Sequence, residues 1–216
     1  MWECALDQVP SVGRILVAGA GRGGLSRELH RKGHDVVSVD LHPEHFVAKD
    51  LTCELADLLQ PLTFPDDSFD AVLAVEVVEH LENPWAFLRE ALRVVKPRGA
   101  VVFTSPNVQS AAGRIQYAGT GQLPYFREQS FAGCYHVTPI FSWAVERFCR
   151  TAEATLKATT YSRVDWPTSQ DIPNYSGGLL RRVKRITPLN ELTGEIACFK
   201  IEKGGTVTVP IGVHYR

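Results

Sequence analysis

The 216-residue sequence has no long apolar run and no excess of charge of either sign. Its most apolar stretch, residues 71–78, is interrupted by Glu76 and is far shorter than the roughly 20 apolar residues that a membrane-spanning helix needs. Residues 1–10 lack the basic stretch and apolar core of an export signal. The 23 basic and 24 acidic side chains leave a formal charge of -1, so no overall field attracts nucleic acid. We expect neither export nor membrane insertion, and no nucleic-acid partner.

Cysteine is scarce, and its spacing argues against a disulfide framework. The five cysteines lie far apart, form no CxxC pair and are odd in number, so they cannot all close into disulfides: Cys4, Cys53, Cys134, Cys149 and Cys198. Reduced thiols are typical of cytosolic proteins. We therefore expect a cytoplasmic protein, and we expect no metal site.

The first half of the chain alternates apolar runs with helical patterns. Residues 14–19, 34–40 and 70–78 read as buried strands, and a helical pattern covers about 23–31. From Asn83, the sequence NPWAFLREALRVVKP combines a capping residue, a proline in the first turn and apolar residues at helical spacing. Such alternation predicts a parallel sheet covered by helices.

Two stretches of the second half have no sustained period. Residues 106–139 hold several glycines and aromatics, and residues 166–194 are irregular as well. Loops of this length usually carry function, so we interpret both as insertions that cover the acceptor side of a single domain spanning 1–216. Around them we expect further elements: a helix over about 141–157, strands over 158–165 and 195–203, and an edge strand over 206–216.

Residues 15–24, ILVAGAGRGG, join a buried strand to a glycine turn and a helix start. Gly19, Gly21 and Gly24 fit the pattern GxGxxG, in which glycines allow a tight turn and a close approach of the backbone to a ligand. Asp40 ends the second strand, where a carboxylate can accept hydrogen bonds from both hydroxyls of a ribose. The combination serves a nicotinamide dinucleotide as well as the adenosine of S-adenosylmethionine, so it predicts a ligand class without choosing between them.

The middle of the chain carries the most specific pattern. From Asp57 it reads DLLQPLTFPDDSFDAVLAVEVVEHLENPWAFLREALRVVKPRGAVVFTSPN. The order of glycine turn, acid, DL pair, FPDDSFD, EVVEH, KPRG and SPN resembles the class I S-adenosylmethionine-dependent methyltransferases of the small-molecule type, over residues 15–107. The resemblance implies S-adenosyl-L-methionine as cofactor. It also implies a Rossmann-like, doubly wound α/β fold: a seven-stranded, mostly parallel sheet with an antiparallel last strand, helices on both faces, and an irregular insertion over the cofactor cleft.

The resemblance also assigns the cofactor-binding residues. The glycine turn would pass beneath the methionine part, the acid after the second strand would hold the ribose, the DL pair would lie against the adenine, and the residues after the fourth strand would face the sulfonium. In chain order the expected residues are Gly19, Ala20, Gly21, Gly23, Asp40, Leu41, Asp57, Leu58, Glu76 and Val77.

Three positions leave parts of this assignment open. Asp50, in KDLT, offers a second acid–Leu pair, but only Asp57 stands directly before QPLTFPDDSFD, so we favour Asp57. Val17 occupies the position, two residues before the first glycine, where the resembling proteins usually carry an acid near the methionine ammonium. Glu76 could supply that charge from across the cleft; alternatively it is a strand-end carboxylate facing solvent.

The acceptor side offers two histidines. Methyl transfer from a sulfonium needs an in-line nucleophile held away from water, and a base helps when that nucleophile is an alcohol. His136, in YHVTPIFSW after the first irregular stretch, is the candidate general base; alternatively it fastens that stretch to the next helix. His80, in EVVEH, belongs to the scaffold that the resembling proteins share, so we favour a structural hydrogen-bonding role for it.

Three functions therefore remain open. We favour methyl transfer to an oxygen or nitrogen atom of a small-molecule or glycan acceptor. Val17 and the absence of a clear base support a non-catalytic S-adenosylmethionine-binding regulatory protein, and GxGxxG with Asp40 supports a nicotinamide oxidoreductase. The basic run 181–185, RRVKR, could contact an acidic acceptor, although charge runs usually form solvated faces.

Overall fold

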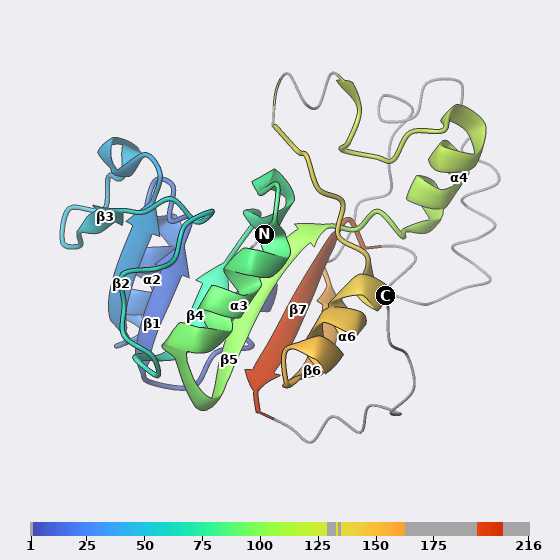
Figure 1. Cartoon of the computed structure of the whole chain (residues 1–216). Helices are drawn as coiled ribbons and strands as arrows, with labels where there is room; N and C mark the ends of the chain where they lie inside the picture. The colour runs from blue at the N-terminus through green and yellow to red at the C-terminus, as the bar shows by residue number, and fades with distance from the viewer. Residues whose placement is uncertain (1, 129–132, 134, 163–193, 205–216) are drawn as a thin grey trace.

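The computed structural model describes residues 2–128, 133, 135–162 and 194–204, and its fold is drawn in Figure 1. Residues 166–193 of the second irregular stretch, which include the basic run 181–185, lie outside the described residues. The expected edge strand over 206–216 lies outside them too. Within the described ranges, no helix has both the length and the apolar character that crossing a membrane requires.

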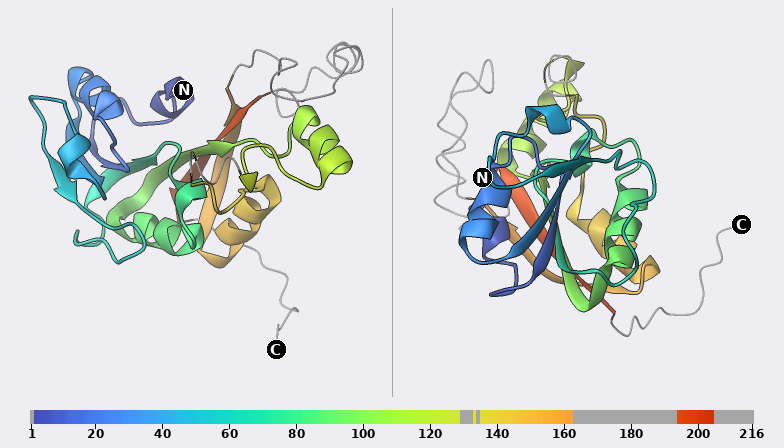
Figure 2. Two further views of the ribbon diagram at one scale, coloured as in Figure 1. Left: turned by 90° about the horizontal axis from the view of Figure 1, so that it is seen from above. Right: turned by 90° about the vertical axis from the view of Figure 1, so that its left-hand side faces the viewer.

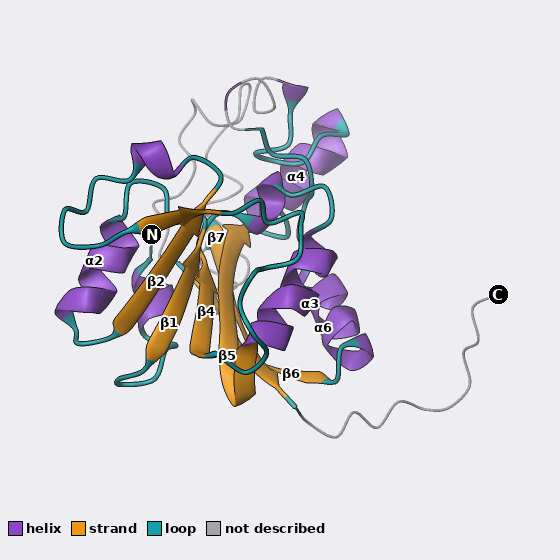
Figure 3. Cartoon of the chain, turned by 60° about the vertical axis from the view of Figure 1, so that its left-hand side comes forward, coloured by secondary structure: helices purple, strands orange, loops and turns teal. Residues whose placement is uncertain are grey.

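Among the described residues, seven strands form one twisted sheet, which Figure 3 shows most openly. Its order is β3-β2-β1-β4-β5-β7-β6; the pairs from β3 to β5 are parallel, and β7 is antiparallel to both of its neighbours. The strands are β1 (Arg14–Ala18), β2 (Asp35–Asp40), β3 (Cys53–Leu55), β4 (Phe69–Ala74), β5 (Val95–Pro106), β6 (Ala154–Tyr161) and β7 (Ile196–Lys203). This confirms the expected Rossmann-like sheet and its antiparallel strand.

Helices cover both faces of the sheet, as the end-on view in Figure 2 shows. Strand β1 explains why two layers are needed: Leu16 and Ala18 pack into one apolar core, and Ile15 and Val17 pack into a second core on the opposite face. The helices are α1 (Glu3–Leu6), α2 (Gly24–Arg31), α3 (Pro84–Val94), α4 (Ala111–Thr120) and α6 (Ser142–Thr151), with short 3-10 helices η1 (Pro43–His45) and η2 (Val78–His80). The doubly wound architecture is thus confirmed.

Helix α3 begins where the sequence predicts it. The Asn83 side chain accepts a hydrogen bond from the Ala86 N–H at 3.2 Å, and Pro84 occupies the first turn. The buried face of α3 includes Phe87 and Leu88, which pack against the sheet. Because α3 follows η2 closely, this packing also fixes the segment at the carboxyl end of β4.

The second half departs from the prediction in two boundaries. The helix expected over 141–157 is wrong in its last turn and a half, because α6 ends at Thr151 and β6 already begins at Ala154. The strand expected over 158–165 accordingly starts four residues earlier, at Ala154. Glu153 has a φ of 51°, a left-handed conformation that no helix continues through, and the threonines that follow favour a strand.

The irregular structure expected over 106–139 is wrong for ten of its residues, since α4 forms there. The Ser110 hydroxyl accepts a hydrogen bond from the Gly113 N–H at 3.1 Å, and Gly121 ends the helix in a left-handed conformation. Glycines inside the helix weaken its sequence pattern, which is why the period was missed. Figure 1 places α4 beyond the carboxyl end of β5.

Candidate functional site

The turn between β1 and α2 can be made only by glycine at its first position. Gly19 has a φ of 71°, and a Cβ atom there would lie 2.4 Å from Val77 Cγ2, which follows β4. A Cβ on Gly21 would meet nothing within 4 Å, so this part of the turn faces open space. The glycine turn therefore packs directly against the segment after β4 and presents bare backbone on its other side, as a closely approaching ligand requires.

The N–H groups of the turn point toward β2 rather than outward. Gly19 and Ala20 both donate to the Val39 carbonyl, at 2.9 and 3.0 Å. Gly21 donates to Asp40 Oδ2 at 2.8 Å, and Asp40 Oδ1 accepts from the backbone N–H of His42 at 2.8 Å. Asp40 thus holds the turn in place, and each of its oxygens keeps a further lone pair for a ribose hydroxyl.

Asp57, one of the two residues expected at the adenine, borders a hollow beside β2 and β3, whereas Leu58 does not. Asp57 is exposed and its Oδ1 accepts from the Leu59 N–H at 2.9 Å, whereas Leu58 is buried. The hollow has a volume of about 340 Å³ and is lined by Val39, Leu41, Glu54, Leu55, Ala56, Asp57, Gln60, Pro61, Leu62, Thr63 and Phe64. Asp57 follows the carboxyl end of β3, whereas Asp50 precedes the strand. Since ligands of such sheets bind at carboxyl ends, the position favours Asp57.

Val17 is a core residue, so β1 has no charge at the position where the resemblance leads us to expect an acid. Its side chain is 1% exposed and belongs to the apolar core on the α2 face, with Leu25 and Cys198. An acid in its place would need a partner to compensate for its burial.

Glu76 lies where a charge facing the sulfonium was expected, and it is not a freely solvated carboxylate. It is half-buried, with a φ of 54° directly after β4. Its N–H donates to Thr104 Oγ1 at 2.9 Å, and the Thr104 hydroxyl donates to Glu76 Oε1 at 2.8 Å. Burial raises the pKa of this carboxyl group above its ordinary value. Two hydrogen bonds to β5 thus hold Glu76 in an unusual backbone conformation.

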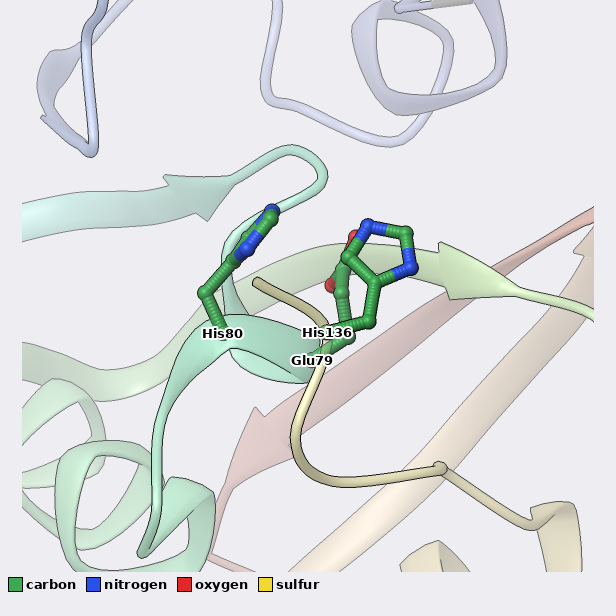
Figure 4. Close-up of side chains that lie close together, drawn as sticks. All are labelled: Glu79, His80 and His136. Atoms are coloured by element: carbon green, nitrogen blue, oxygen red, sulfur yellow. The ribbon is translucent and has the colours of Figure 1, made fainter. Parts of the chain in front are cut away.

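His136 is brought next to His80, although 56 positions separate them in the sequence. Their ring centroids are 4.7 Å apart, and the rings are nearly perpendicular. Figure 4 shows both rings beside Glu79, with all three side chains extending in the same direction. One ligand atom from each of the three residues lies within 4.8 Å of the others. The two histidines that the sequence left open therefore belong to one cluster.

Glu79 is the site residue that sequence reasoning missed. Its side chain is fully buried, and neither carboxylate oxygen has a hydrogen-bond partner among the described residues. Burial, and then the negative charge of Glu76, raise the pKa of Glu79 to about 9. An unpaired buried polar group costs about 1–3 kcal/mol, so its retention requires an explanation. The available signal was the EVVEH run itself, which places two acids and a histidine within five residues.

A known sequence family matches this part of the chain. Residues 16–103 match the family described as methyltransferase domain. A 2-methyl-6-phytyl-1,4-hydroquinone methyltransferase from Synechocystis sp. is 36% identical over 110 residues, which cover 47% of this chain and 35% of the relative. A ubiquinone biosynthesis O-methyltransferase from Azorhizobium caulinodans is 36% identical over 102 residues, covering 44% and 40%. The matched part thus spans less than half of the length of either relative.

Solved structures extend the similarity to the whole fold. An S-adenosylmethionine-dependent methyltransferase from Archaeoglobus fulgidus superposes with a TM-score of 0.65 at 17% identity, covering 94% of this chain and 91% of that chain. One from Mesorhizobium loti gives 0.65 at 18% identity, covering 93% and 96%. The antiparallel β7 between β5 and β6 departs from the strand order 3-2-1-4-5-6 of dinucleotide-binding folds. Residues 16–103 thus match a methyltransferase-domain family, and the fold as a whole is that of solved S-adenosylmethionine-dependent methyltransferases.

Proposed function

We propose that this chain transfers the methyl group of S-adenosylmethionine to an oxygen or nitrogen atom of a small molecule. The observation that carries the proposal is the bond between Gly21 and Asp40, because it makes the glycine turn and the strand-end acid one rigid unit. The two neighbours of Asp40 in the chain, Val39 and Leu41, line the hollow beside Asp57. Ribose and adenine then have one acid each, at the ends of adjacent strands.

The relatives favour a small-molecule acceptor. Their names refer to a hydroquinone, to ubiquinone biosynthesis and to demethylmenaquinone, and one of them specifies an O-methyltransferase. We therefore propose a hydroxyl-bearing, ring-containing acceptor, and a glycan acceptor stays a prediction. The free thiols of Cys4, Cys53, Cys149 and Cys198, in the described part of the chain, support the cytoplasmic location that we propose.

In the reaction the acceptor atom attacks the methyl carbon while the carbon–sulfur bond breaks, and S-adenosylhomocysteine leaves with the bonding electron pair. This chain contributes alignment and exclusion of water. Among the sequence candidates, His136 lies nearest to a proton-accepting role, because its ring is only half-buried beside η2. The Gly19–Val77 contact ties η2 to the cofactor turn, and so brings acceptor-side and cofactor-side residues together.

Calorimetric titration with S-adenosylhomocysteine, and with NADH for comparison, tests the cofactor part. We expect stoichiometric binding of the former only. Asp40→Ala should weaken it about 10- to 100-fold, since hydrogen bonds to a charged group contribute about 1.5–3 kcal/mol. Asp35→Ala is the matched control, because Asp35 begins the same strand at its opposite end and is exposed. Equal affinity in both variants, or preference for NADH, would contradict the proposal.

Turnover on a panel of phenols, alcohols and amines tests the transfer itself. The second candidate function is a non-catalytic cofactor-binding protein, which the buried Val17 favours because it leaves β1 without a charge for the methionine end. Methylated product from any acceptor excludes this candidate. Tight binding of S-adenosylhomocysteine without product from the whole panel would favour it over the enzyme.

A further inference from the structure

Glu79 is a buried carboxyl group whose two oxygens have no partner in the described chain. Its side chain is 0% exposed, both of its oxygens lack hydrogen-bond partners, and no basic side chain forms an ion pair with it within the described residues. Glu76, the other acid of this segment, adds negative charge instead of relieving it. A charged carboxylate in this position needs a cation or a set of donors, and the residues that the structure describes supply neither.

The backbone holds His136 beside this carboxylate. The Glu79 carbonyl accepts two hydrogen bonds, from Val137 at 2.9 Å and from Thr138 at 3.0 Å. The Thr138 hydroxyl donates to the Leu81 carbonyl at 2.7 Å, which joins the same segment to the residue directly after η2. Three hydrogen bonds therefore clamp the segment after His136 onto η2, and the nearness of the two side chains does not depend on their own interaction.

The ring of His136 is oriented as a metal ligand is. Its Nδ1 lies 3.0 Å from the Tyr125 carbonyl oxygen, which can only accept, so Nδ1 carries the proton. That tautomer leaves the lone pair on Nε2 free. A histidine whose other ring nitrogen donates to a backbone carbonyl is the usual arrangement around a bound metal ion.

We propose that Glu79, His80 and His136 bind one divalent metal ion. One ligand atom of each residue already lies within 4.8 Å of the other two. Metal–nitrogen and metal–oxygen bonds of about 2.0–2.2 Å bring neighbouring ligands to roughly 3.3 Å, so the atoms must close by about 1.5 Å at most. His80 is exposed and can make most of that movement without disturbing the core.

The ligand types select the kind of metal. Magnesium and calcium prefer oxygen ligands throughout, whereas two imidazoles and one carboxylate suit zinc or a first-row transition metal. Three protein ligands also leave a coordination position open, as in catalytic zinc sites. Because Glu79 is buried and His80 exposed, the open position faces outward. The proposed site departs from the sequence-based expectation that the chain has no metal site.

The role of the metal rests on the proposed methyl transfer. A hydroxyl oxygen of the acceptor would fill the open position, and coordination lowers the pKa of that hydroxyl so that its proton leaves to solvent. The oxygen then forms the new bond to the methyl carbon as the carbon–sulfur bond breaks. His136 acts here as a ligand and holds the acceptor through the metal, which replaces the free general base.

The test uses full-length protein from which a chelator has removed metal ions. It is titrated with Co²⁺, with the visible absorption spectrum as readout, and separately with Zn²⁺, with calorimetry as readout. We expect one ion per chain and no thiolate-to-metal charge-transfer band. Glu79→Gln, His80→Ala and His136→Ala should each weaken binding by at least about tenfold. The control variant replaces His42 and His45, two exposed histidines next to Glu44, with alanine, and should bind as the wild type does.

Three results would overturn the site: no stoichiometric binding by the wild type, unchanged affinity in the three variants, or a thiolate band that places the ion on cysteine. S-adenosylhomocysteine is titrated into the same samples. Retained binding shows that each variant is folded, and His80→Ala, altered only on the surface, is the reference if Glu79→Gln unfolds. Loss of S-adenosylhomocysteine binding in the wild type would count against the proposed function and leave the metal site standing.

Discussion

Replacing Gly19 with alanine separates two costs that the structure places on one atom. The first is conformational, because the φ of 71° puts a non-glycine residue in the left-handed region. The second is steric, because the new Cβ would lie 2.4 Å from Val77 Cγ2 and 3.3 Å from Cγ1. A left-handed residue costs about 1–2 kcal/mol, and overpacking costs about 1–3 kcal/mol. We therefore expect Gly19→Ala to lower the free energy of unfolding by about 2–5 kcal/mol.

Three further variants divide this sum: Val77→Ala, the double variant Gly19→Ala with Val77→Ala, and Gly33→Ala. Val77→Ala removes both of the offending methyl groups, so Gly19→Ala made in that background should cost only the conformational part, about 1–2 kcal/mol. Gly33→Ala is the matched control, because its φ is 92° and no atom lies within 4 Å of the added Cβ. It should also cost about 1–2 kcal/mol.

Urea unfolding of the wild type and of the four variants gives their free energies of unfolding. Calorimetry with S-adenosylhomocysteine measures the consequence for binding. We expect Gly19→Ala to lose binding and the double variant to recover part of it. If Gly19→Ala costs the same with and without Val77, the contact between the turn and the segment after β4 does not set the geometry. A Gly19→Ala protein that binds as tightly as the wild type would refute the close-approach argument altogether.

Three smaller predictions follow from individual contacts. Asp57→Ala should weaken S-adenosylhomocysteine binding about tenfold, whereas Asp50→Ala should leave it unchanged; the reverse order would assign the adenine to the other acid. The Lys96 ammonium lowers the pKa of Asp70, so the stability from this pair is present above the ordinary carboxyl pKa and is lost as pH falls through the lowered value. Asp70→Asn should therefore reduce the dependence of the free energy of unfolding on pH in the acid range, by no more than about 1 kcal/mol for this partly exposed pair. Asn107→Ala should destabilise the protein by about 1–3 kcal/mol in urea unfolding, because its buried Nδ2 donates to a carbonyl before β7 at 2.8 Å, and no change would mean that the bond is dispensable.

The predictable part of the fold rests on local signals. Ten consecutive residues, 15–24, predict the β1–turn–α2 unit, and the capping residue Asn83 predicts the start of α3. The boundary at Glu153 could not be predicted in this way. A left-handed glutamate has no sequence signature, and the helical pattern before it continues smoothly into the strand.

The positions of the expected cofactor residues at strand ends were predictable for the same reason, whereas their hydrogen bonds were not. The sequence predicts a close approach of the glycine turn's backbone to a ligand. In the structure the N–H groups of Ala20 and Gly21 instead donate hydrogen bonds to residues of β2. That pairing depends on how far β2 extends past β1, which is a register property of the sheet. Val17 is similar, because its burial follows from which face of β1 it occupies.

The cluster of Glu79, His80 and His136 is the least predictable feature. Two of its members share η2, and the third comes from a segment whose path across η2 is fixed by backbone hydrogen bonds to the Glu79 carbonyl. No periodicity of either segment encodes that crossing. The sequence predicts separate roles for the two histidines, a structural one for His80 and a base for His136. In the structure their ring centroids lie 4.7 Å from each other.

Three of the six non-glycine residues with a positive φ in the described chain lie around that cluster. Glu76, Tyr125 and Tyr135 have φ angles of 54°, 66° and 55°, and each such conformation costs about 1–3 kcal/mol in a non-glycine residue. Tyr125 supplies the carbonyl that orients His136, and Tyr135 directly precedes it. Glu79 adds a buried carboxyl group that has no hydrogen-bond partner among the described residues. None of these features helps the core to pack, so stability does not account for them. A site that must hold two histidines and an acid in one fixed arrangement does, since departures from local preference are expected where function demands them.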